Sequence, residues 1–223
     1  VAPLAASRAP VDFVIVSFGL AIGPLDEDRE EVFQELRSKG CGEPVLSEAR
    51  ELTLITRRVL LSRFTTGLED LRRFKAAHAQ EPWLKEVEGD FTGPMVQTPE
   101  DQFGKLIEAL SFDAILDYDA RATLERVRTP MLWVVAGQDT EAPSAPTLEV
   151  LRALQPDPGQ LDIAVFPRAD HGMIDMEMRD GKRRAMGHSP GYFDLLAHWI
   201  AERSLEGTFG AAQLQPDATN GRL

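Results

Sequence analysis

Residues 131–143 (MLWVVAGQDTEAP) and 161–173 (LDIAVFPRADHGM) decide the fold of this chain. Each begins as an apolar run of strand length and stops at small and polar residues, which include Asp139 in one and His171 in the other. Apolar runs of this length are typical of strands that a parallel sheet buries on both faces. We therefore predict two buried strands, at 131–136 and 161–166, whose following loops carry Asp139 and His171.

A third strand and two helices extend this pattern. Residues 11–18 (VDFVIVSF) are nearly all apolar and rich in β-branched side chains, so they read as another buried strand. Helices are expected at 145–154 and 191–203, and Ser189 with Pro190 suits the N-cap and first turn of the second. Strands that alternate with helices at these separations favour an α/β fold with right-handed crossovers.

Between the first strand and the other two lies a block without strand character. Charged segments with helical spacing of apolar residues run over 26–39 and 47–80, with an interruption near 65–67. Residues 81–99 are expected to be irregular because Pro and Gly are scattered through them, and 100–110 to be helical. This block is predicted to be a helical insertion.

Three strands make an incomplete doubly wound sheet. The first strand would leave a long apolar edge exposed unless another strand paired with it. We therefore expect an N-terminal half beyond the given chain. The alternative is a small complete sheet whose remaining strands are hidden in the helical block.

The amino-acid composition limits the kinds of molecule that this chain is expected to bind. A formal net charge of −12 over 223 residues argues against a nucleic-acid partner, which requires clustered Lys and Arg. No stretch approaches the length of a membrane span, and residues 1–10 do not resemble a signal peptide. The compartment stays open, since a targeting segment would lie upstream. The single cysteine, Cys41, forms no internal disulfide, and no cofactor or metal site is expected.

The order of elements resembles the C-terminal portion of an α/β-hydrolase that lacks the nucleophile elbow. The resemblance rests on G-x-D at 137–139, D-H-G at 170–172, and the approach to the acid strand at 117–130, which is similar to that of bacterial esterases and peptidase-like members. Residues 1–10 resemble the end of the helix that follows the nucleophile. The resemblance implies a serine a few residues upstream of Val1.

The same resemblance implies the domain organisation. Residues 1–24 and 111–204 would form the sheet domain, 25–110 a helical cap, and 205–223 a flexible tail. The partners it implies are a small-molecule ester or acyl substrate and a missing N-terminal segment or companion chain that supplies the nucleophile. It leaves the oligomeric state open.

Ester hydrolysis by a Ser-His-Asp triad is the implied chemistry. His171 would take the proton from the serine hydroxyl, and Asp139 would bond the other ring nitrogen and stabilise the imidazolium. A carboxylesterase is the main expectation, and an acyl-peptidase or thioesterase would use the same groups. The alternative is a non-catalytic binding module that keeps the fold without the nucleophile.

Other residues compete for these roles. Asp119 and Asp170 are alternative acids, although Asp170 adjoins His171 in sequence and is expected to point elsewhere. Ser17 also ends a strand, but Ile15 is too large for the position two before a nucleophile, and no G-x-S-x-G occurs in the chain.

The remaining histidines and a group of acidic residues are read as structural. His78, His188 and His198 are expected to pack or to face solvent. Residues 173–187 read as a long loop, and the acidic residues beside it have no spacing that suits a metal. These residues are Asp170, Asp175, Glu177 and Asp180.

Overall fold

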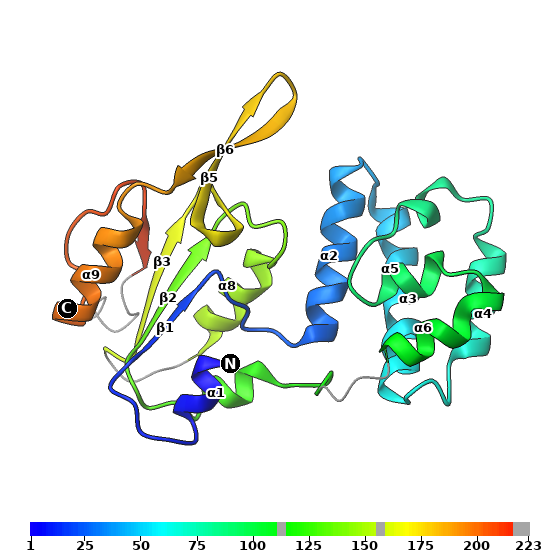
Figure 1. Ribbon diagram of the computed structural model, residues 1–223, viewed down its shortest axis with the longest axis horizontal. Coiled ribbons are helices and arrows are strands. Elements are labelled where there is room, and N and C mark those ends of the chain that lie inside the picture. Colours follow the sequence, from blue (N-terminus) through cyan, green and yellow to red (C-terminus); the bar gives the residue numbers. More distant parts are fainter. Residues whose placement is uncertain (111–114, 155–158, 216–223) are drawn as a thin grey trace. The chain divides into compact units, whose positions relative to one another are not determined.

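The computed structural model describes residues 1–110, 115–154 and 159–215 and divides the chain into two compact units (Figure 1). One unit comprises Val1–Ile22 and Asp119–Leu223, and the other comprises Gly23–Tyr118. The unit boundaries fall after residues 22 and 118, whereas the sequence suggested 24 and 110. Residues 111–114, on which part of the predicted boundary rests, lie outside the described residues.

A mostly parallel sheet organises the first unit. Its strand order is β1-β2-β3-β7, where β1 is Val14–Ser17, β2 is Met131–Ala136, β3 is Leu161–Phe166 and β7 is Gln213–Gln215. The first three strands run parallel, and β7 pairs antiparallel with β3. The fold is therefore mixed α/β.

The predicted bounds of β2 and β3 are confirmed, whereas two other predictions need correction. Strand β1 is shorter than expected, because only Val14–Ser17 find register partners on β2, at Met131 to Val134. The flexible tail predicted at 205–223 is wrong for residues 205–215, which include β7 and the buried Phe209. The end of that predicted tail, 216–223, lies outside the described residues.

Helices cover both faces of the sheet, which explains the apolar run of β2. Met131, Trp133 and Val135 point to a core layer shared with Leu151 of α8 (Ser144–Ala153). Helices α1 (Ala2–Ala6) and α7 (Ala120–Leu124) lie in the same unit, and Ala6 and Leu124 join that layer. The alternate residues of β2 face α9 (Tyr192–Glu202) and pack on Leu195 and Trp199. Alternation between two buried layers removes the polar face that a half-exposed strand would show.

A second, antiparallel sheet follows β3. It has the order β4-β5-β6, formed by β4 (Ala169–Asp170), β5 (Ile174–Arg179) and β6 (Lys182–His188), with the short helix η3 (His171–Met173) after β4. The long loop predicted at 173–187 is therefore wrong. Asp180 and Gly181 both have positive φ, 53° and 70°, and this Asp-Gly pair is the turn signal of a two-residue hairpin.

The start of α9 also differs from the prediction. Ser189 is buried, and its hydroxyl donates to Asp175 rather than capping the helix. Gly191, with φ 84°, is the residue that precedes the first turn. A residue in the left-handed region with backbone of Phe209 and Gly210 close by leaves no room for a side chain, so glycine occupies this position.

The second unit consists of helices joined by turns over its described residues, 23–110 and 115–118. It contains α2 (Pro24–Ser38), α3 (Glu43–Leu61), α4 (Leu68–Ala77), η1 (Pro82–Glu86), α5 (Thr92–Gln97), η2 (Glu100–Gln102) and α6 (Phe103–Leu110). No strand occurs in this described part, so it hides no further strands of the sheet. The stretch 81–99, expected to be irregular, holds η1 and α5 and buries Trp83.

A buried carboxylate holds the helices of this unit together. Asp28 of α2 accepts hydrogen bonds from the backbone N–H groups of Phe91 and Thr92, at 2.7 and 2.9 Å, and from the Thr92 hydroxyl at 2.6 Å. The Thr92 hydroxyl lies 2.8 Å from that of Thr56 on α3. Three helices thus meet at one polar cluster, and burial raises the pKa of Asp28 against the opposing effect of these hydrogen bonds.

Truncation of Leu195 tests the core layer under α9. We expect Leu195→Ala to lower the free energy of unfolding by about 2–5 kcal/mol, because the removed atoms leave a cavity in a fully buried position. Urea unfolding followed by tryptophan fluorescence measures the change. Ile200→Ala, on the exposed face of the same helix, is the matched control and should change stability by at most about 0.5 kcal/mol. Equal losses in the two variants would contradict the assigned layer.

The acid–base behaviour of Glu31 generates a second prediction. Burial, with the neighbouring Asp90 charge, raises the pKa of Glu31 from 4.5 to about 7. The folded chain therefore holds a proton that the unfolded chain releases, so stability falls as pH rises between these two values. Because water screens a half-buried group, the loss should be about 1 kcal/mol.

Thermal unfolding by circular dichroism at about pH 5 and about pH 8 measures this dependence. Glu31→Gln should reduce the loss of stability on the alkaline side and leave the contribution of Asp28. The control Glu30→Gln removes a carboxylate that pairs with Arg29 at 2.9 Å and should keep the full dependence. An unchanged dependence in Glu31→Gln would refute the assignment.

Candidate active site

The candidate site lies in the loops that follow β2 and β3. Ala136 and Phe166, the last residues of these strands, are register partners, so the two loops begin side by side. The loop after β2 stays attached to its neighbour, because Gly137 N–H donates to Phe166 O and Gln138 N–H donates to Ala169 O, both at 2.8 Å. A Cβ on Gly137 would lie 2.8 Å from Pro167 Cα, so only glycine permits this approach.

Asp139 is buried and oriented by its own loop. Its side chain is 1% exposed, and Oδ1 accepts the N–H groups of Glu141 at 2.9 Å and of Ala142 at 2.7 Å. These two backbone donors fix the plane in which the carboxylate lies. The loop after β2 thus holds the Asp139 carboxylate in a fixed orientation that faces the loop after β3.

His171 meets this carboxylate. Its Nδ1 lies 3.2 Å from both Asp139 Oδ1 and Asp139 Oδ2, and its side chain is 35% exposed. The chain turns back directly after it, with Gly172 at φ 71° and Met173 at φ 60°, and the buried Met173 anchors the turn in the core. Phe18 packs edge-on against the imidazole, with ring centroids 5.0 Å apart.

The other ring nitrogen has a weaker contact. His171 Nε2 lies 3.7 Å from a carboxylate oxygen of Glu141, whose side chain is 73% exposed. A distance of 3.7 Å is too long for a hydrogen bond. The geometry leaves Nε2 available to act on a group brought close to it.

The competing acids are occupied elsewhere. Asp119 caps α7, where its side chain accepts the N–H of Ala122 at 3.0 Å. Asp170 accepts bonds from Thr140 and pairs with Arg183, so it points away from the imidazole of its neighbour. Of the three candidate acids, Asp139 is the one that the structure brings to His171.

Ser17 lies at the carboxyl end of β1 but bonds a different partner. Its hydroxyl is 2.8 Å from the hydroxyl of Tyr192, and the described residues show no hydrogen bond between Ser17 and His171. The following residue, Phe18, has φ 43°, and its ring packs against the imidazole.

The remaining candidates have structural contacts. His188 stacks near Tyr192, His78 stacks on Phe74, and His198 lies beside Phe209. Asp175, one of the acidic residues weighed as a metal ligand, pairs with Arg168 at 2.8 Å. Within residues 1–110, 115–154 and 159–215, no group of three His, Cys, Asp or Glu is placed to hold a metal ion.

Sequence reasoning missed four contributors to the site. Glu141 and Thr140 follow Asp139 directly, and their polarity at a strand end was an available signal. Arg183 reaches the site from β6, and Phe18 from the position directly after β1. Both contacts join segments far apart in the sequence, so no local sequence pattern indicates them.

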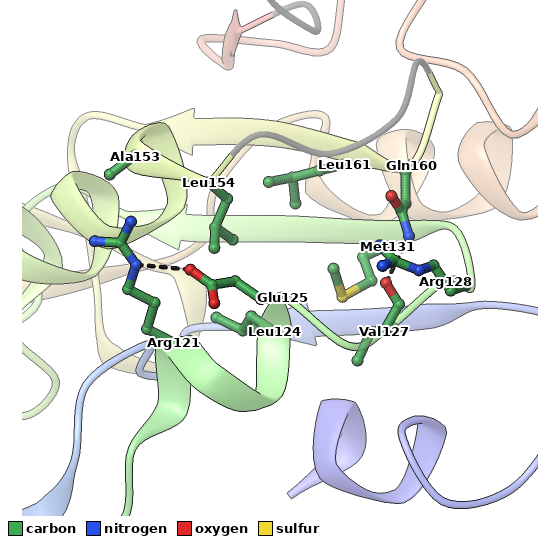
Figure 2. A pocket seen from close by; sticks show the side chains of 10 residues that line it. All are labelled: Arg121, Leu124, Glu125, Val127, Arg128, Met131, Ala153, Leu154, Gln160 and Leu161. Atoms are coloured by element: carbon green, nitrogen blue, oxygen red, sulfur yellow. Dashed lines mark hydrogen bonds and ion pairs between the residues drawn. The ribbon is translucent and has the colours of Figure 1, made fainter.

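A hollow of about 450 Å³ lies at the opposite end of the strands (Figure 2). Met131 and Leu161, the first residues of β2 and β3, form part of its wall, and Arg121 pairs with Glu125 beside it at 2.9 Å. Because Asp139 and His171 follow the other ends of these strands, this hollow belongs to a different place in the unit.

Comparisons with known proteins add no assignment. No family model matches the chain, no curated protein matches it, and no solved structure matches it. Among the described residues, no helix has the length and apolar character needed to cross a membrane.

The imidazole tautomer tests the Asp139–His171 contact. A carboxylate beside Nδ1 stabilises the neutral tautomer that carries its proton there. In Asp139→Asn the amide oxygen can keep the backbone bonds while its NH₂ group faces Nδ1, so the proton should move to Nε2. Two-bond ¹H–¹⁵N spectra of the folded chain distinguish the tautomers. Asp119→Asn is the matched control, and a Nδ1–H tautomer that survives Asp139→Asn would contradict the contact.

Proposed function

We propose that this chain is the C-terminal portion of an α/β-hydrolase and contributes Asp139 and His171 to a Ser-His-Asp triad that hydrolyses carboxylic esters. One observation carries the proposal: a buried carboxylate lies 3.2 Å from Nδ1 of an accessible histidine, in loops at the carboxyl ends of neighbouring parallel strands. Open α/β sheets place their ligands at this edge.

The geometry suits a general base. With the Nδ1 proton donated to Asp139, Nε2 carries a lone pair and can accept the proton of a serine hydroxyl as its oxygen attacks the ester carbonyl. The imidazolium returns this proton to the leaving alkoxide as the carbon–oxygen bond breaks. Water then attacks the acyl-serine by the same route, and Asp139 stabilises the imidazolium in both halves.

The nucleophile would come from a preceding segment or from a companion chain. Strand β1 forms one edge of the described sheet, and Ile15 and Val16 are only half-buried there. A further parallel strand paired on this edge would end beside Ser17 and Phe18, at the same edge of the sheet as His171. A serine after that strand would then have access to Nε2.

Esters are the proposed substrates because an alkoxide leaves more readily than an amine. Thioesters and acyl-peptides present the same carbonyl carbon, and the same three groups would act on them. The apolar side chains of the helical unit, among them Leu52, Phe74 and Met95, pack in its own core. These side chains therefore stabilise the helical unit itself.

A non-catalytic binding module is the second candidate function. The observation that favours it is that no described serine hydroxyl hydrogen-bonds to His171. In such a module the Asp139–His171 pair would be a structural contact between two loops. The two candidates differ in whether an activated serine reaches Nε2.

Labelling with a fluorophosphonate decides between them. The protein is taken from its natural source, so that any preceding segment or companion chain is present, and intact masses are recorded before and after treatment. We expect one adduct on a serine, and a loss of labelling rate on the order of 10³-fold or more in His171→Ala.

His188→Ala is the matched control, because this exposed histidine contacts Tyr192 and Phe193 rather than Asp139. It should label at the rate of the unaltered protein. Absence of any adduct on the natural protein, or equal labelling of His171→Ala, would favour the binding module.

A further inference from the structure

Asp170 links the two loops of the candidate site. It directly precedes His171, and its Oδ1 accepts the N–H of Thr140 at 3.0 Å and the hydroxyl of Thr140 at 3.1 Å. Thr140 directly follows Asp139. The neighbour of the base is therefore bonded to the neighbour of the acid. The Asp170 side chain is 15% exposed, whereas Thr140 lies at the surface.

Arg183 completes the link from the hairpin. Its Nη2 lies 2.9 Å from Asp170 Oδ2 and donates to Gln138 O at 3.2 Å. Each carboxylate oxygen of Asp170 thus has its own partner. Gln138 precedes Asp139, so the residues on both sides of the acid are held by the Asp170–Arg183 pair.

The contact between acid and base needs such support. His171 Nδ1 is 3.2 Å from both oxygens of Asp139, longer than the 2.7–2.9 Å of a strong charge-assisted bond. A contact of this length lies at the long end of the range for hydrogen bonds, so a shift of one loop by a few tenths of an ångström would break it.

We propose that Asp170 and Arg183 are positioning residues. They hold the loop that carries Asp139 against the loop that carries His171 and so maintain the contact between these two side chains. Their effect on catalysis rests on the proposed function, whereas their positioning of Asp139 against His171 does not. The β5–β6 hairpin thereby supports the site through Arg183, in addition to the pairing of β5 with β4.

The neighbouring Arg184 supplies a matched control. It lies on the same strand and is 54% exposed, and its ion pair is a contact of 3.9 Å with Asp180 at the hairpin turn. Arg183→Gln and Arg184→Gln therefore remove the same charge one residue apart on the same hairpin. They differ in whether the bond to Asp170 is lost.

The test measures the imidazole tautomer of His171 by ¹H–¹⁵N spectra under alkaline conditions, in which imidazole side chains are neutral. His171→Ala identifies the signal. We expect the ratio of the Nδ1–H to the Nε2–H tautomer to fall several-fold in Asp170→Asn and Arg183→Gln, and to stay unchanged in Arg184→Gln. Arg183→Lys, which keeps one donor group, should restore part of the ratio.

A purely structural role would lower the unfolding temperature without moving this ratio in the folded chain. An unchanged ratio in folded Arg183→Gln would overturn the proposal, and this surface variant serves even if Asp170→Asn fails to fold. In the whole protein, Arg183→Gln should lower kcat about 10- to 100-fold with little change in KM. A tautomer shift without any fluorophosphonate labelling of the natural protein would uphold the positioning role and refute the hydrolase.

Discussion

The parallel pairing of β2 with β3 is the constraint on which the candidate site depends. Six consecutive residue pairs, from Met131 with Leu161 to Ala136 with Phe166, align the two strands so that they end together. Helices bury both faces of this pair, so a shift in register would move buried side chains of both layers. The strand ends are thereby fixed, and the loops that carry Asp139 and His171 start from neighbouring points.

Polar contacts then orient the loop side chains that the paired strands bring close together. Backbone donors aim Asp139, left-handed residues turn the chain after His171, and Asp170 with Arg183 joins the two loops. The sheet core could not do this alone, because apolar packing fixes strand positions but not the direction of a loop side chain. The helical unit uses a similar device at Asp28, where one buried carboxylate gathers segments that apolar contacts bring together.

Sequence patterns predicted what depends on local composition. The bounds of β2 and β3, the helical character of the insertion and the mixed α/β class follow from apolar periodicity, and the structure confirms them. The hairpin at β5 and β6 was missed although Asp180-Gly181 is a turn signal, because its strands carry mostly polar, exposed side chains. Strand β7 was missed because three residues rich in Gln show no strand pattern until β3 offers them an edge.

By itself the sequence determined the buried strands β2 and β3, and it marked Asp139 and His171 as polar residues in the loops that follow them. These properties are local, since burial of a strand requires apolar side chains along its whole length. Only the tertiary structure decided that Asp139 rather than Asp119 or Asp170 meets the imidazole. That choice depends on distances between loops 30 or more residues apart, which long-range register and hydrogen bonds set and no local pattern encodes.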